Sequence, residues 1–180
     1  MKNKLSTLLD KPRTRGMIAL CLSMTSLILA CSAQATETLT QVTKLSNRYD
    51  IQHYIRVADA EELLMRMGAA GTVATSEGLT LLAKYVEANF QASGEFGAVT
   101  IETLSAEVDD QFVYIEQMTS PAVSGALPQQ LELESRLLQD LDTQAVSYIE
   151  LQAGPQTTLV RVTTGRSVRL FDPRSRDLLY

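Results

Sequence analysis

The sequence predicts a mainly β protein: an immunoglobulin-like antiparallel β-sandwich of about seven strands, with two helices inserted after the second strand. Three observations lead to this α+β fold. Short segments alternate between apolar and polar residues and are separated by turn residues, which is typical of a sandwich. Within about residues 58–91 the apolar spacing changes to three and four, as in amphipathic helices. Strands and helices do not alternate along the chain, so no parallel sheet with crossover helices is expected.

The first two strands are predicted to form a hairpin. Residues 39–45 are apolar enough for a strand, and Asn47 and Arg48 provide the turn. Residues 49–57 alternate apolar and polar side chains more clearly than any other segment. The only histidine, His53, falls on the apolar side of this second strand.

Two helices are predicted next. Asp59 is expected to cap the first helix, with Glu62 completing a capping box. Its apolar side is predicted to consist of Leu63, Leu64 and Met67. Thr75 or Ser76 is expected to begin the second helix. Its buried stripe is predicted to consist of Leu79, Leu82, Val86 and Phe90.

The chain then returns to strands. The alternation from residue 99 to residue 108 changes phase once, which predicts a β-bulge. Residues 112–118 carry apolar side chains on both faces, so this strand is expected inside a sheet, and residues 119–130 form a loop. The remaining strands are predicted at residues 131–137, 145–152, 157–163 and 167–171, the last two forming a hairpin.

Residues 1–35 are predicted to be a secretory signal, followed by a single globular domain over residues 36–180. Five basic residues and one acidic residue precede an uncharged apolar run from Met17 to Ala30. A basic segment, an apolar run of about 7–15 residues and an exit of small residues are typical of export signals. The run is shorter than the roughly 20 residues of a membrane span. An uncleaved anchor and a buried core helix are the alternatives.

Two processing sites compete in this segment. Ala33-Gln34-Ala35 fits the small-x-small rule and would leave Thr36 as the new N-terminus. Residues 28–31 resemble a bacterial lipobox, in which Cys31 becomes the acylated first residue, although Leu29 is bulkier than that pattern usually has. Cys31 is therefore the candidate lipidation residue. The predicted location is the periplasm, or the membrane surface facing it.

The charge of the mature part limits its partners. Residues 36–180 carry 11 basic and 20 acidic residues, a net charge of −9. This balance repels phosphate backbones and anionic lipids, so no nucleic acid is expected, and membrane contact is expected only through the signal or a lipid anchor. Both cysteines, Cys21 and Cys31, precede Thr36, which excludes a disulfide or thiolate site in the mature part.

His53 and Asp59 are the candidate polar site. His53 is interpreted either as a base or metal ligand, or as a neutral core histidine bonded to backbone or to Asp59. One imidazole does not make a typical zinc site, and the acidic runs do not match calcium-loop spacing. No serine-hydrolase, phosphate-loop or dinucleotide motif occurs. We therefore assign no catalytic residue, metal or cofactor from the sequence.

The order of segments resembles a family of small exported bacterial proteins of unknown function, over residues 38–171. The segments that carry this resemblance are His53–Glu61, Leu81–Phe90, Phe112–Glu116, Glu134–Leu141, Val146–Leu151 and Thr158–Phe171. The resemblance implies export and a sandwich-like fold, and no activity. A weaker resemblance is to the extracytoplasmic sandwich domain of hydrogenase-accessory nickel/cobalt permeases. This sequence lacks their membrane helices, so transport is not expected.

The expected function is that of a non-catalytic binding or interaction module of the bacterial envelope, whose partner is another envelope protein or a small ligand. The alternatives are a hydrolase that uses His53 and a metal-handling periplasmic protein. A hydrolase needs His53 in a cleft, with a hydroxyl or carboxylate within about 3 Å. Metal handling needs carboxylate oxygens that converge on the same ring.

Overall fold

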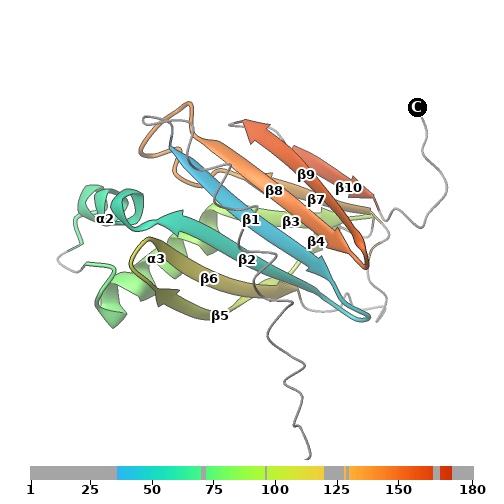
Figure 1. Cartoon of the computed structure of the whole chain (residues 1–180), viewed down its shortest axis with the longest axis horizontal. Helices are drawn as coiled ribbons and strands as arrows, with labels where there is room; N and C mark the ends of the chain where they lie inside the picture. The colour runs from blue at the N-terminus through green and yellow to red at the C-terminus, as the bar shows by residue number, and fades with distance from the viewer. Residues whose placement is uncertain are drawn as a thin grey trace, which may run out of the picture. The chain divides into compact units, whose positions relative to one another are not determined.

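Strands dominate the part of the chain that the computed structural model describes, which is residues 36–69, 72–95, 97–119, 128, 130–163 and 167–171. These residues belong to the compact unit Ala35–Tyr180. The elements are β1 (Glu37–Lys44), β2 (Tyr49–Arg56), α2 (Val57–Arg66), α3 (Ser76–Asn89), β3 (Phe90–Gly94), β4 (Gly97–Val99), β5 (Ile101–Val108), β6 (Phe112–Thr119), β7 (Gln130–Ser135), β8 (Val146–Ala153), β9 (Gln156–Thr163) and β10 (Ser167–Phe171) (Figure 1). The predicted signal segment, with Cys31, lies outside the described residues.

The strands form two sheets, a six-stranded one in the order β5-β6-β2-β1-β8-β9 and a four-stranded one in the order β10-β7-β3-β4. The prediction of a mainly β fold with two inserted helices is confirmed. The strand count is corrected, because the described residues contain ten strands instead of about seven. The expectation of wholly antiparallel pairing is also wrong, because β1 runs parallel to β8. Parallel neighbours need a long connection, and every element from β2 to β7 lies between these two strands.

The predicted hairpin between residues 157–163 and 167–171 is wrong. The strands exist, but β9 pairs with β8 in the six-stranded sheet, whereas β10 pairs with β7 in the four-stranded sheet. Alternation and turn residues show where a strand ends. They do not show whether the chain folds back within one sheet or crosses to the other.

Helices α2 and α3 follow β2, as predicted, but α2 begins differently. Its N-cap is Arg56, which makes no side-chain capping bond, so the capping box of Asp59 and Glu62 is wrong. The helix starts directly at the end of β2, which places Asp59 in its first turn, 2.7 Å from the Arg56 guanidinium. The buried side consists of Ala60, Leu63 and Leu64. Met67, predicted for that side, is 46% exposed.

Helix α3 agrees with its prediction. Thr75 is the N-cap, and its hydroxyl accepts a hydrogen bond from the Gly78 N–H at 3.1 Å. A Cβ atom at Gly78 would lie 2.1 Å from the Thr72 carbonyl oxygen, so this close approach requires glycine. The buried stripe contains Leu82, Val86 and Phe90, with Leu79 partly buried. The helix contacts β5 and leads into β3 (Figure 1).

Burial alternates along the six-stranded sheet, which defines its inner face and its outer face. On β2 the side chains of Tyr49, Ile51, His53 and Ile55 are buried and form part of the inner face. The intervening side chains lie on the outer face and are partly exposed. The helices and the four-stranded sheet contribute to the core that covers the inner face. In β5 the register slips between Thr103 and Ser105, which confirms the predicted bulge.

Candidate functional site

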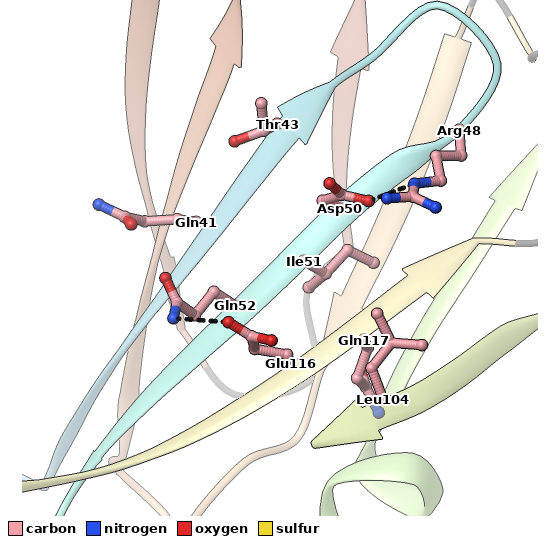
Figure 2. A pocket seen from close by; sticks show the side chains of 9 residues that line it. All are labelled: Gln41, Thr43, Arg48, Asp50, Ile51, Gln52, Leu104, Glu116 and Gln117. Atoms are coloured by element: carbon pink, nitrogen blue, oxygen red, sulfur yellow. Dashed lines mark hydrogen bonds and ion pairs between the residues drawn. The ribbon is translucent and has the colours of Figure 1, made fainter. Parts of the chain in front are cut away.

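A pocket of about 330 Å³ opens on the outer face of the six-stranded sheet (Figure 2). Its polar lining on the outer face consists of Gln41, Thr43, Arg48, Asp50, Gln52 and Glu116. Leu104, at the β5 bulge, is an apolar member of the lining and is 53% exposed. The volume falls at the lower end of the range for small-molecule sites.

Strand register brings the polar side chains of the pocket into one row. Gln41 on β1 lies opposite Gln52 on β2, and Gln52 lies opposite Glu116 on β6. The row extends to Glu150 on β8 and to Ser105 on β5. Successive residues of a strand point to opposite faces, and the neighbours of Gln41, Gln52, Glu116 and Glu150 are buried, while Ser105 bonds to Glu116. All five side chains therefore lie on the outer face, and we call them, together with Tyr54, the outer polar row.

Hydrogen bonds connect the outer polar row at both ends. Gln41 Nε2 donates to Glu150 Oε2 at 2.7 Å, and Ser105 Oγ donates to Glu116 Oε2 at 3.1 Å. The contact between Gln52 Nε2 and Glu116 Oε1 is longer, at 3.5 Å, and is the weakest in the row. Figure 2 shows these two side chains next to each other at the pocket. Their polar atoms are the ones best placed to bond a ligand.

The centre of the row has too few hydrogen-bond donors. The Tyr54 hydroxyl lies 2.7 Å from Gln41 Oε1 and 2.6 Å from Gln52 Oε1, yet it carries one proton. If that proton goes to Gln41, Gln52 Oε1 lacks a donor. If the Gln52 amide turns to donate to Tyr54, its oxygen faces the Glu116 carboxylate instead. If the Tyr54 proton goes to Gln52 instead, Gln41 Oε1 lacks a donor. In each arrangement the row lacks one donor, at Gln41 or on the Gln52 side, and both residues line the pocket.

An ion pair forms another wall of the pocket. Arg48 Nε lies 2.7 Å from Asp50 Oδ1, and the two side chains are 41% and 40% exposed. Arg48 Nη1 also approaches Met118 Sδ at 3.7 Å. Because the two charges compensate, this wall presents both donors and acceptors without net charge.

Two further aromatic rings lie beside Tyr54 of the outer polar row. Tyr54 and Tyr114 contact edge to face, with ring centroids 5.2 Å apart, and Phe112 is 6.4 Å from Tyr114. Burial raises the pKa of Tyr54, and the negative charges of Glu150 and Glu116 raise it further. The phenol therefore stays protonated at neutral pH and acts as a donor.

His53 lies on the inner face and is fully buried, with 0% exposure. Its Nδ1 is 2.9 Å from Thr40 Oγ1, and its Nε2 is 2.9 Å from Gln117 Oε1. The ring packs edge to face on Phe90 at a centroid distance of 4.6 Å. Burial lowers the pKa of His53 to about 4, although the Gln117 hydrogen bond opposes this change. The ring is therefore neutral at pH 7.

The hydrogen bonds around His53 favour one tautomer. Gln117 Nε2 donates to Thr103 Oγ1 at 3.1 Å, so Gln117 Oε1 faces the ring and accepts the Nε2 proton. Nδ1 then accepts from the Thr40 hydroxyl. Both ring nitrogens are satisfied in the neutral state, and the residue is fully buried. This geometry favours a core histidine and does not support a hydrolase that uses His53.

The predicted pair of His53 and Asp59 does not form a common site. Both ring nitrogens of His53 bond to Thr40 and Gln117, whereas both carboxylate oxygens of Asp59 bond to Arg56, at 2.7 and 3.2 Å. Within the described ranges, no three His, Cys, Asp or Glu side chains gather as a metal site would require.

In the same part of the chain, the helices are too short or too polar to cross a membrane.

No protein-family model matches the chain, and no curated protein matches it with significant similarity. The resemblances to exported proteins and to the permease domain therefore stay expectations. The geometry of the outer face is the basis for a functional proposal.

Sequence reasoning missed the outer polar row. Gln41, Gln52 and Glu116 each occupy a polar position of an alternating strand, as solvent-facing residues commonly do. Each of the three predicted strands carries an amide or a carboxylate at such a position. These residues can be recognised as one group only once the register shows that they are neighbours.

Proposed function

We propose that the chain is an exported, non-catalytic binding module of the bacterial envelope and that its binding site is the pocket on the outer face. The observation that carries this proposal is the outer polar row, which lacks one hydrogen-bond donor beside the pocket. A ligand that donates to Gln41, Gln52 or Glu116 supplies this donor. Of the two expected partner classes, the pocket favours a small ligand over an envelope protein.

The ligand class follows from the lining of the pocket. Amide, carboxylate and guanidinium groups offer both donors and acceptors, and the Arg48–Asp50 pair adds no net charge. The rings of Tyr54 and Tyr114 do not line the pocket, but they add an apolar surface on the same face. A ligand with several hydroxyl groups and a weakly polar carbon skeleton matches this combination. We therefore propose a sugar or short oligosaccharide.

Export and membrane attachment are part of the same proposal. They rest on the basic and apolar segment before residue 31 and on the two competing processing sites, after Ala35 and before Cys31. Replacing Leu27 and Leu29 by Asp should leave unprocessed chain in the cytoplasm. Labelled palmitate on the wild type, and its absence from a Cys31→Ala variant, would establish the lipid anchor. A periplasmic product that begins at Thr36 would establish cleavage after Ala35 instead.

We also propose that the sandwich is a variant of the immunoglobulin-like type. The two packed sheets support this relationship. The parallel β1–β8 pair and the inserted helices are its departures. A topology comparison against experimentally solved immunoglobulin-like domains tests it, and a better match to another two-sheet fold would contradict it.

Calorimetric titration tests the ligand proposal. The probes are glucose, glucosamine, N-acetylglucosamine and their short β-linked oligomers. For a probe that binds the wild type, Glu116→Ala should weaken binding by about tenfold or more, because it removes a charged acceptor. The matched control is Glu107→Ala, which removes the same charge from an exposed position that does not line the pocket. Its affinity should equal that of the wild type. Failure of every probe to bind, or equal losses in both variants, would contradict the proposal.

A further inference from the structure

The edges of the two sheets differ in how well they can accept another strand. Three edges are poor templates: β4 has three residues, β10 has five, and β5 is interrupted by the register slip next to Leu104. The fourth edge, β9, has eight residues and pairs with β8 without any slip. Figure 1 shows β9 beside β8, and no described strand pairs with its other side.

The side chains of β9 also suit an interface. The strand contains no proline or glycine, is rich in threonine and valine, and carries one charge, Arg161. Leu159 is 47% exposed on the outer face, and Val160 is partly buried on the inner face. Natural proteins protect edge strands with charges, bulges or short lengths, because an open edge pairs readily with another chain. A long, regular edge with a single charge lacks these protections and is a suitable template for pairing.

We propose that β9 pairs with β9 of a second copy of this chain, antiparallel about a two-fold axis at Val160. Val160 then lies opposite Val160 of the second copy, and Leu159 lies opposite Arg161. The remaining directly opposite pairs are Thr158 with Val162 and Thr157 with Thr163. No like charges face each other in this register, whereas centring the axis on Arg161 would bring two arginines together. The self-complementary pattern is why a second copy is the partner.

The proposed pairing joins two six-stranded sheets into one continuous sheet. Antiparallel pairing about an axis perpendicular to the sheet keeps the two outer faces on the same side. Two pockets then open in the same direction. This dimer does not depend on the identity of the ligand and can be tested without it.

Single-cysteine cross-linking tests the register. The unit Ala35–Tyr180 contains its own core, and a chain that begins at Thr36 has no cysteine. Val160→Cys should give a disulfide-linked dimer on mild oxidation, because directly opposite Cα atoms are about 4.5–5.5 Å apart. Leu159→Cys, one residue away from Val160, and Leu104→Cys, on the opposite edge of the sheet, are the controls. Both should remain mostly monomeric. Equal cross-linking of all three variants, or none at Val160→Cys, would overturn the proposal.

Sedimentation equilibrium of two variants of Leu159 gives a second test. This side chain is exposed, so neither change should unfold the chain. Leu159→Lys places a positive charge opposite Arg161 of the second copy, at two symmetric positions. The dimer dissociation constant should rise by about fivefold or more. Leu159→Glu should lower it. Within one copy, position 159 lies opposite Glu150, so the same two changes should have the opposite sign on monomer stability. A wild type that stays monomeric at all concentrations, or two variants with equal dissociation constants, would refute the pairing.

Discussion

The two faces of the six-stranded sheet carry similar chemical groups in very different surroundings. On the inner face, Thr40, His53 and Gln117 are at most 1% exposed, and each polar atom of the imidazole has a partner. On the outer face, the side chains of the outer polar row are partly or fully exposed, and the row lacks one donor. The inner face stabilises the fold, whereas the outer face has bonding capacity left for a ligand.

This difference shows that residue type is a weaker guide to function than access. A lone histidine attracts attention because its unperturbed pKa lies near neutrality. Here burial removes it both from substrate and from its usual titration range. Glutamines and a glutamate attract little attention, yet they line the pocket.

The largest effect expected from a single substitution lies in the core behind the inner face. Leu82 is 0% exposed in the middle of the α3 stripe. Leu82→Ala should lower the free energy of unfolding by about 2–5 kcal/mol, because it leaves a cavity. Lys84→Ala, on the exposed side of the same helix, should change it by less than about 0.5 kcal/mol. Urea denaturation measures both values. Wild-type stability of the Leu82 variant would show that the helix is peripheral.

A second effect is a loss of stability in mild acid. Because the pKa of His53 is about 4 in the folded state and near 6.5 in the unfolded state, the unfolded chain binds the proton first. The contribution of the neutral ring is complete above pH 6.5 and is lost as the pH falls toward 4. The loss should reach about 3 kcal/mol.

The control for this acid effect is His53→Gln, which cannot titrate but can still bond to Thr40 and Gln117. Its free energy of unfolding should vary less between pH 6.5 and 4 than that of the wild type. Equal pH dependence in the two proteins would assign the acid sensitivity to carboxylates and contradict this account.

A smaller difference is expected between two neighbours on β6 that point to opposite faces. Gln117→Ala leaves the buried Nε2 proton of His53 without an acceptor and should cost about 1–3 kcal/mol. Glu116→Ala removes an exposed side chain and should cost less than about 0.5 kcal/mol. Thermal and urea denaturation of both variants would sharpen the contrast between the faces. Similar costs would mean that the outer polar row is also structural.

Local patterns predicted much of the fold. The alternation along β2 correctly placed His53 inward, the phase change correctly located the bulge at Leu104, and Thr75 correctly began α3. Each of these features depends on residues a few positions apart. The α2 cap failed because the helix continues directly from a strand, and the sheet pairing of Arg56 determines where that strand ends.

Long-range pairing could not be predicted from local patterns. The parallel contact of β1 with β8 joins residues such as Gln41 and Glu150, and nothing in either segment identifies the other. The same limit concealed the candidate site. Its side chains come from β1, β2, the turn between them, β5 and β6, and the register of the strands makes them neighbours.

The most direct test of the contrast between the two faces is the titration of His53 by NMR. The sequence contains one histidine, so an untagged protein gives one set of imidazole signals. We predict a neutral ring, protonated on Nε2, from pH 8 down to at least about pH 5.5, with a midpoint near 4. A midpoint near 6.5 would mean that His53 is accessible to solvent and would contradict the closed inner face, whereas a ring protonated on Nδ1 would only reverse the hydrogen bonds to Thr40 and Gln117.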